Sequence, residues 1–198
     1  MTTARKLMTP EEFAIEYEGK GYDLVDGTPQ AMPPPKPEHG RAQIAIGGVL
    51  CPLFQRKAKG SSNKPGGWWL MTEAPVKYGR LHLYSHDVAG WRRERSCEYP
   101  EGYPISLRPD WVCEILSSNF RDDRVRKQKV LHEWEVPFYW LVDPGFREIR
   151  ILEWHDEDYK IVKDVDVDFR GALPPFDAVP ISVKALFGLD DDNDEDAP

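Results

Sequence analysis

Apolar residues recur in short runs along the chain, and their spacing predicts alternating strands and helices. Two runs, 111–116 and 138–143, are apolar at nearly every position, which is typical of central strands covered on both faces. Segment 122–135, between them, has an apolar stripe at helical spacing. Further strands are predicted over 22–32 (a hairpin), 68–73, 76–78, 81–91, 148–154 and 159–165, and further helices over 9–19, 38–59 and 182–187. This order predicts an α/β (α+β) fold with a mixed central sheet flanked by helices.

Local signals support several of these elements. Thr9 followed by Pro10 and two glutamates is typical of a helix start, and Asp26-Gly27 predicts the tight turn of the first hairpin. Two helices are expected to bury one face each. The apolar residues on these faces are Val130, Leu131 and Trp134 in helix 122–135, and Ile44, Val49, Leu53 and Phe54 in helix 38–59.

The composition fits a single globular domain. The chain has 198 residues, 40% of them hydrophobic, and seven tryptophans, which is enough to build one core. No apolar run approaches the ~20 residues of a membrane span, and the N-terminus lacks the apolar stretch of a signal peptide. We therefore expect a cytoplasmic protein without a membrane partner. Three cysteines with no C-x-x-C pair argue against a disulfide framework and against a zinc ribbon.

The negative charge is concentrated at the C-terminal end. The formal net charge is −8, and residues 190–198 carry six acidic groups and no basic ones. Because like charges at this density repel and cannot be buried, we expect a disordered tail after a single domain over 1–189. Basic residues cluster at 56–64, 92–95 and 121–129. Such clusters usually lie on solvated faces of a protein. If the fold gathers them on one side, they would instead bind a nucleic-acid backbone.

Three charged residues stand where apolar ones are expected. Glu114 lies on an apolar face of the first central strand, where an unpaired carboxylate would be very costly. Asp87 precedes two small residues on an earlier strand, a sign that another element approaches closely. Lys127 falls on the apolar stripe of the helix that follows Glu114, so it should point toward the core and toward that glutamate.

These residues allow two interpretations. Glu114 and Lys127 would form a structural ion pair, with Asp87 as the cap of a strand end. Alternatively, two carboxylates and a lysine are the groups that metal-dependent phosphodiester hydrolysis requires. The acids hold a divalent cation through oxygen ligands, and the cation lowers the pKa of a bound water. The lysine orients the water or stabilises the charge of the transition state.

Several motifs, taken in order, resemble one known family. They are Met8–Phe13, Tyr22–Gly27, Asp87–Arg95, Arg108–Ser118 and Val136–Pro144. Together they closely resemble the Uma-type endonucleases of bacteria, which belong to the PD-(D/E)XK superfamily and have the restriction-endonuclease-like fold. The resemblance covers about residues 8–165. It implies a metal-dependent nuclease that acts on DNA with Mg²⁺ or Mn²⁺ and works as a homodimer. The strands predicted over 148–154 and 159–165 would add a hairpin region at the C-terminal side of this core.

The resemblance also implies roles for individual residues. Asp87 and Glu114 match the two acidic metal ligands, with the backbone carbonyl of Ile115 as an added ligand. Lys127 matches the lysine that this family carries on the following helix. Position 116 is Leu, so the lysine is absent from the place it holds elsewhere in the superfamily.

Other residues resemble accessory positions. Glu73 matches an acid found in part of the family, where it would be a further metal ligand or a hydrogen-bond partner. Glu38 and His39 open a helix that often supplies another acid in the wider superfamily. Candidates for contact with phosphate groups are Arg92, Arg93, Arg124 and Arg126.

The chain departs from the family pattern at several positions. His86 stands where a proline usually precedes the metal-binding aspartate, Asp23 stands in place of a glutamate, and Ser118 in place of a proline. A literal Pro-Asp pair occurs at Pro109-Asp110. Residues four apart on one strand lie ~13 Å apart, so Asp110 is too far from Glu114 to share one small cation with it.

Two other classes of function stay open. A non-catalytic nucleic-acid-binding or regulatory protein on the same fold would use Glu114 and Lys127 as a structural pair. An oligomeric structural or partner-binding protein would use its tryptophans and acidic tail for contacts. A melting temperature that rises with Mn²⁺ would favour a vacant acidic site over a closed ion pair.

Overall fold

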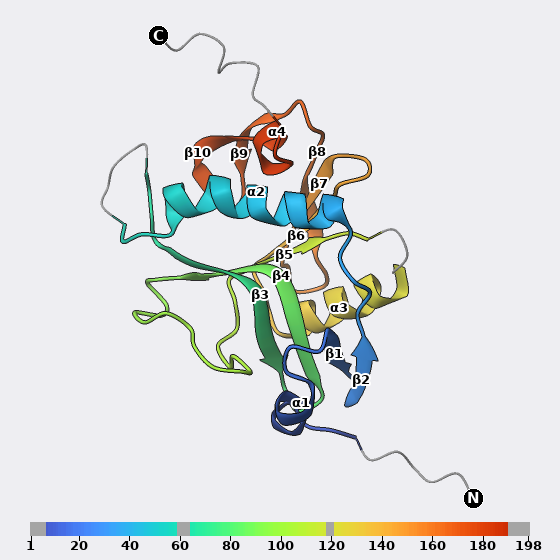
Figure 1. Ribbon diagram of the computed structural model, residues 1–198. Helices are drawn as coiled ribbons and strands as arrows, with labels where there is room; N and C mark the ends of the chain where they lie inside the picture. The colour runs from blue at the N-terminus through green and yellow to red at the C-terminus, as the bar shows by residue number, and fades with distance from the viewer. Residues whose placement is uncertain (1–6, 59–63, 118–120, 190–198) are drawn as a thin grey trace, which may run out of the picture.

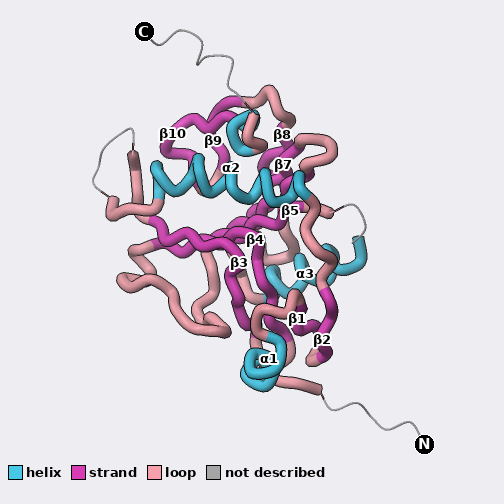
Figure 2. The backbone as a smooth tube through the Cα atoms, viewed as in Figure 1, coloured by secondary structure: helices cyan, strands magenta, loops and turns pink. Residues whose placement is uncertain are grey.

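The computed structural model describes residues 7–58, 64–117 and 121–189 (Figure 1). A mixed sheet runs through the middle of this part of the chain, with helices against both of its faces (Figure 2). The helices are α1 (Pro10–Tyr17), α2 (Pro37–Phe54), α3 (Arg121–Glu133) and α4 (Val183–Leu186). The strands are β1 (Tyr22–Val25), β2 (Thr28–Ala31), β3 (Trp68–Tyr78), β4 (His82–Arg92), β5 (Trp111–Ile115), β6 (Phe138–Asp143), β7 (Glu148–Glu153), β8 (Lys160–Val165), β9 (Arg170–Leu173) and β10 (Phe176–Ser182). Ser118 and the predicted tail 190–198 lie outside the described residues.

The main sheet is eight-stranded, in the order β2-β1-β4-β5-β6-β7-β8, with β3 paired to β4 outside this path. Strands β5 and β6 are parallel and α3 connects them, whereas the pairs on either side are antiparallel. Strands β9 and β10 form a separate two-stranded sheet. The predicted mixed sheet with flanking helices is therefore confirmed, and the hairpin predicted over 148–154 and 159–165 is the antiparallel pair of β7 and β8.

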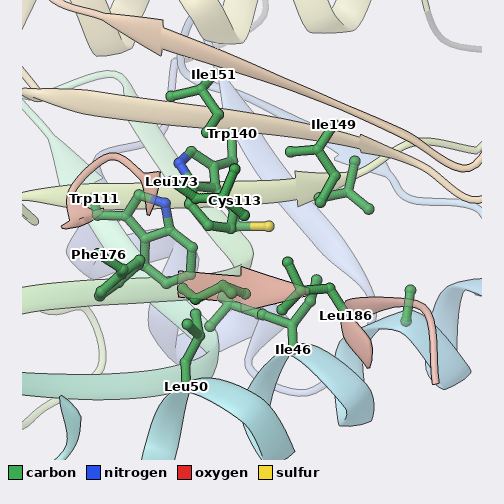
Figure 3. Close-up of a cluster of buried hydrophobic side chains, with 14 of the residues drawn as sticks. Ile46, Leu50, Trp111, Cys113, Trp140, Ile149, Ile151, Leu173, Phe176 and Leu186 are labelled. Atoms are coloured by element: carbon green, nitrogen blue, oxygen red, sulfur yellow. The ribbon is translucent and has the colours of Figure 1, made fainter. Parts of the chain in front are cut away.

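The central strands are buried on both faces, as their continuous apolar runs predict. On one face, under α2, α4 and the β9–β10 sheet, the rings of Trp111, Trp140 and Phe176 pack edge to face (Figure 3). On the other face, Val112 packs in a second cluster with Leu131 of α3. Because side chains alternate along a strand, β5 contributes to both clusters and holds the two layers together.

The first helix and the first hairpin follow local signals. The Thr9 hydroxyl accepts a hydrogen bond from the Glu12 amide (3.2 Å), and the Glu12 carboxylate accepts one from the Thr9 amide (3.0 Å). This reciprocal capping box starts α1 at Pro10. Asp26 and Gly27 have φ values of 49° and 70°, which the tight turn between β1 and β2 requires.

The predicted buried faces of two helices need correction. In α2 the buried residues are Ala42, Ile46, Leu50 and Phe54, four apart, whereas Ile44 is 76% exposed. A strict four-residue stripe faces the sheet, and Ile44 lies two positions off it. In α3, Val130 and Leu131 are buried as predicted, but Trp134, the residue after the helix, is 40% exposed, and its ring meets that of Tyr78 at an interplanar angle of 73°.

The strand predictions also differ from the structure in two places. Segments 68–73 and 76–78 belong to one strand, β3, whose register with β4 is the same on both sides of Glu73. The hairpin of β9 and β10 was not predicted, because the segment 170–182 shows no clear alternation of apolar and polar residues. No helix in the described ranges is both long and apolar enough to cross a lipid bilayer.

Candidate functional site

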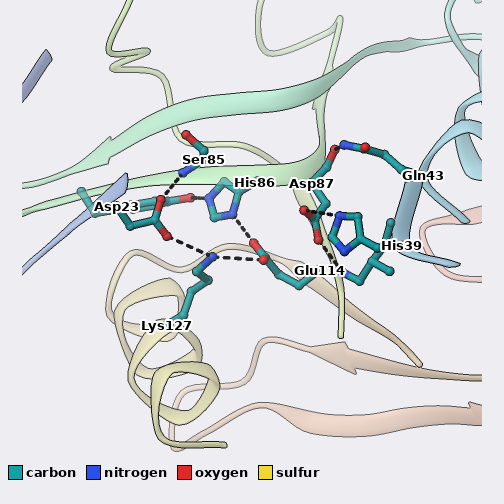
Figure 4. A network of polar contacts seen from close by, with 10 residues as sticks. Asp23, His39, Gln43, Ser85, His86, Asp87, Glu114 and Lys127 are labelled. Carbon is teal, nitrogen blue, oxygen red and sulfur yellow. Dashed lines mark hydrogen bonds and ion pairs between the residues drawn. The ribbon is translucent and has the colours of Figure 1, made fainter. Parts of the chain in front are cut away.

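A pocket of about 520 Å³ opens where the ladder between β4 and β5 ends. The last paired residues are Val88 and Cys113, so Asp87 and Glu114 follow directly beyond the ladder on the two strands. The beginning of α2 contributes His39 to the lining and α3 contributes Lys127 (Figure 4). The ionisable side chains that line it are those of Asp23, His39, Glu73, Asp87, Glu114 and Lys127, together with four tyrosines.

Asp87 is held between the sheet and α2. Its Oδ2 accepts a hydrogen bond from the Ile115 amide (2.6 Å), so the side chain satisfies a backbone N–H group at the end of β5. Its Oδ1 lies 3.1 Å from Nε2 of His39. The Gln43 side-chain amide donates to the Asp87 carbonyl (2.9 Å) and to Oε1 of Glu73 (2.6 Å), which ties the helix to both strands.

Glu114 is held between two other basic groups (Figure 4). Its Oε2 accepts a hydrogen bond from Nζ of Lys127 (3.0 Å), and its Oε1 lies 2.6 Å from Nδ1 of His86. His86 is fully buried, and its Nε2 lies 2.7 Å from the Tyr78 hydroxyl. Lys127 also lies 3.5 Å from Oδ2 of Asp23. The four oxygens of Asp87 and Glu114 therefore all have partners within the protein.

Burial and neighbouring charges shift the pKa values of three buried groups, Glu114, Lys127 and Asp23. Burial opposes the charge of Glu114, but Lys127 and His86 outweigh it and hold the pKa of Glu114 below its ordinary value. Burial likewise opposes the charge of Lys127, but Glu114 and Asp23 hold its pKa well above the ordinary value. For Asp23 burial dominates over the attraction of Lys127 and raises the pKa. Lys127 therefore stabilises the Glu114 carboxylate first and that of Asp23 second.

The donor set suits a hard divalent cation in kind. Carboxylate oxygens are the ligands that Mg²⁺ and Mn²⁺ prefer, and Asp87, Glu114 and Glu73 line one pocket. Among the described residues, however, no three His, Cys, Asp or Glu side chains already form a metal-sized cluster. A cation held by Asp87 and Glu114 would have to replace His39 at Asp87 and one of the two basic partners at Glu114.

The other predicted site residues lie at different distances from the pocket. His39 lines it, while Glu38 is exposed at the start of α2. Arg126 is exposed on α3, and the side chain of Arg124 lies outside the described part of the structure.

Arg92 and Arg93 do not line the pocket. They are the last residue of β4 and the residue after it, and their guanidinium groups stack on Trp68 (4.7 Å) and Trp69 (3.3 Å). The Arg93 Nε also donates to the Trp68 carbonyl (2.9 Å). Both arginines are thus engaged with the aromatic edge of β3.

Asp110 has a different role from the pocket acids. Its carboxylate accepts hydrogen bonds from the Arg92 amide (2.7 Å) and from Nε of Arg95 (2.9 Å). These contacts fasten the loop after β4 to the start of β5, and Asp110 does not line the pocket. The spacing argument that set Asp110 aside agrees with this placement.

Sequence reasoning missed two residues of the network. Asp23 is 1% exposed and accepts a hydrogen bond from the Ser85 amide (2.9 Å), and His86 is completely buried. Both had been noted only as departures from a family motif. The signal for Asp23 was an acid inside the short apolar strand Tyr22–Val25. His86 gave no comparable signal, because its burial depends on the pairing of β3 with β4.

Comparison with known proteins places the chain in a family. The model of the Uma2 family, described as "Putative restriction endonuclease", matches residues 10–182. The chain belongs to the Uma2 family. Within the solved structures, this Uma2 chain is similar to a protein of Anabaena variabilis whose crystal structure is titled "a putative nuclease belonging to DUF820". The two share 21% identity with a TM-score of 0.67, over 91% of this chain and 98% of the other. No curated protein matches the chain.

Proposed function

We propose that this Uma2-family protein is a metal-dependent endonuclease that hydrolyses phosphodiester bonds in DNA. The observation that carries the proposal is the meeting of Asp87, Glu114 and Lys127 in one pocket, from three separate elements. Family membership supports the same reaction class. We also propose that the protein works as a homodimer, since cleavage of both strands of DNA favours two centres.

Five residues at the pocket would act in this reaction. Asp87 and Glu114 would hold Mg²⁺ or Mn²⁺, with the carbonyl of Ile115 as a further ligand and Glu73 close by. When bound, the cation supplies a water of lowered pKa and neutralises charge on the phosphate. Lys127 is the one basic residue of these five. It would orient the attacking water and stabilise the negative charge that develops in the transition state.

The basic residues outside the pocket would hold the rest of the substrate. Arg126 is exposed on the helix that carries Lys127, and Arg124 is two residues earlier in the same helix. We propose that both contact phosphate groups. Arg92 and Arg93 would contact the nucleic-acid backbone only farther along, because their stacking on Trp68 and Trp69 holds them at the C-terminal end of β4, outside the pocket.

A second candidate is a non-catalytic nucleic-acid-binding or regulatory protein. The observation that favours it is the closed network: Lys127 is only 4% exposed, and both oxygens of Glu114 are already paired. In this case Glu114 and Lys127 would form a structural ion pair.

Plasmid nicking separates the two candidates. Supercoiled DNA would be incubated with the wild type, Asp87→Asn and Glu114→Gln, with Mn²⁺, Mg²⁺ or EDTA. A metal-dependent nuclease should nick only with the cation, and each isosteric variant should lose about a hundredfold or more in rate. Glu148→Gln, which removes an exposed carboxylate on β7, is the matched control and should keep full activity.

The melting temperature gives an independent readout. Mn²⁺ should raise it in the wild type but not in Asp87→Asn, because a ligand that binds only the folded state stabilises it. A folded protein that neither nicks DNA nor gains stability with Mn²⁺ would support the non-catalytic candidate. Nicking that survives both substitutions would place the reaction elsewhere.

A further inference from the structure

One wall of the pocket is aromatic and proline-rich rather than charged. It is built from the end of α1, the start of β1, the connector between β2 and α2, and the loop between β4 and β5. Its apolar members are Tyr17, Tyr22, Met32, the three prolines 33–35 and Tyr103. The ring of Tyr17 stacks on Phe13 with centroids 5.0 Å apart and also contacts the ring of Tyr22 at 5.0 Å. These two contacts hold Tyr17 in place.

The reactive groups of the same pocket are largely buried. The side chain of Lys127 is 4% exposed, that of Glu114 14% and that of Asp87 15%. A phosphodiester must therefore enter the pocket to reach them. In a duplex the bases face the partner strand and stack on one another, which leaves them unable to meet the wall while the adjoining phosphate reaches the carboxylates.

The charge of the pocket does not favour a bound phosphate group by itself. Among the described lining residues, the basic ones are His39 and Lys127, and both are engaged by carboxylates. Four acids share the pocket with them. Affinity for a nucleotide must then come largely from uncharged contacts, and aromatic side chains provide these by stacking on the faces of bases.

We infer that this wall binds the base of an unpaired nucleotide, so that the pocket accepts single-stranded or locally unpaired nucleic acid in preference to a continuous duplex. The pocket volume of about 520 Å³ is within the usual range for a small-molecule site. The inference rests on the proposed nuclease function and names its substrate class. Tyr103 and Tyr22, both half-buried at the wall, are the residues expected to stack on the base.

Binding to labelled oligonucleotides in EDTA tests the wall without any cleavage. The probes are a thymidine 12-mer, an abasic deoxyribose-phosphate strand of equal length, and a duplex 12-mer, followed by fluorescence anisotropy. The thymidine strand should bind roughly tenfold or more tightly than the abasic strand, the effect of one or two stacked bases. The duplex should bind no more tightly than the abasic strand.

Substitutions in the wall provide the matched comparison. Tyr103→Leu and Tyr22→Leu should abolish the preference for the thymidine strand, whereas Tyr103→Phe, which keeps the ring, should retain it. Tyr99→Leu is the control, because Tyr99 comes from the same loop but lies outside this pocket. Melting temperatures of all four variants would show that each one is folded.

The two proposals fail in different ways. Equal binding of thymidine and abasic strands, or duplex binding as tight as that of the thymidine strand, would overturn the inference. Rapid cleavage of duplex by Tyr103→Leu in Mn²⁺ would do the same and leave the nuclease function intact. Tyrosine-dependent binding of single strands without cleavage of any probe would instead overturn the nuclease function and support the base-binding wall.

Discussion

The Nδ1 atom of His86 lies 2.6 Å from Oε1 of Glu114, beneath the floor of the pocket. On its other side, Nε2 of His86 meets the Tyr78 hydroxyl at 2.7 Å. Burial raises the pKa of Tyr78 well above its ordinary value, so the hydroxyl keeps its proton and is the natural donor to Nε2. Nδ1 then carries the ring proton and donates it to Glu114. In this arrangement Tyr78 and His86 fix the orientation of the Glu114 carboxylate.

Substitutions at His86 should therefore affect activity according to where they place an N–H donor. The amide nitrogen of Asn can occupy the place of Nδ1, whereas that of Gln reaches the place of Nε2 instead. We expect His86→Gln to lower kcat for nicking by roughly 10–100-fold, the usual effect of losing a partner of a metal ligand, with little change in KM. His86→Asn should retain more of the activity.

Two observations would separate positioning from a general loss of structure. Both His86 variants should melt at similar temperatures, and Tyr78→Phe should lower kcat in the same direction. Equal losses in His86→Asn and His86→Gln would contradict a role through Nδ1.

The Glu114–Lys127 pair should dominate the stability of the pocket. Lys127→Met leaves a buried carboxylate with one basic partner fewer, and Glu114→Gln leaves a buried ammonium group without its main partner. Each should lower the free energy of unfolding by about 3–5 kcal/mol. The double variant should lose clearly less than the sum, because neither charge is then left without the other. Urea unfolding at pH 7 measures all three, and strictly additive losses would contradict the coupling.

Asp23 should make stability depend on pH in the acidic range. Its Oδ2 is buried and makes no hydrogen bond among the described residues, and burial raises its pKa. The folded state therefore binds this proton more tightly than the unfolded state does. Consequently the contribution of Asp23 to stability should fall as pH rises from its unfolded pKa of about 3.9 through the raised folded value.

The comparison with Asp23→Asn isolates this effect. The unfolding free energy of the wild type minus that of the variant should decrease as the pH is raised, with a slope of at most about 1.4 kcal/mol per pH unit. Urea unfolding at several pH values from 4 upward gives the difference. An increase with pH would mean that the attraction of Lys127 outweighs the cost of burial.

Two glycines should respond to alanine in opposite directions. A Cβ on Gly90 of β4 would lie 3.0 Å from Leu70, 3.1 Å from Trp111 and 3.2 Å from Trp68, so Gly90→Ala should cost about 1–3 kcal/mol. A Cβ on Gly48 of α2 would meet nothing within 4 Å, and Gly48→Ala should add about 1 kcal/mol through helix propensity. Thermal unfolding tests both, and a loss of stability in both variants would contradict the packing around α2.

Local chemistry made part of this fold predictable. The capping sequence at Thr9 and the Asp26-Gly27 turn depend on residues that are neighbours in the chain, and both were predicted correctly. The buried face of α2 was not, because Ile44 is as apolar as Ile46 and only the packing against the sheet distinguishes them. The hairpin of β9 and β10 lacked a periodic pattern, so its strands escaped prediction.

The pocket shows the same division. Asp87, Glu114 and Lys127 could be singled out because charged residues interrupt apolar patterns, and the structure brings them into one pocket. Asp23 also interrupts an apolar strand, although it was not singled out, whereas the burial of His86 follows from the pairing of β3 with β4 and could not be read from the sequence. Their roles, like those of the other site residues, remain predictions for the experiments above.

Lys127 comes from α3, and this limits how early the pocket can be complete while the chain is being synthesised. The pocket draws Asp23, His39, Asp87, Glu114 and Lys127 from five elements, β1, α2, β4, β5 and α3. The parallel pairing of β5 with β6 requires the α3 crossover between them, and such long-range pairing forms slowly. A nascent chain thus carries the carboxylates before the lysine can be docked against them. The proposed hydrolytic centre therefore cannot be complete before α3 has docked, so a chain that has been made only as far as β5 cannot carry it.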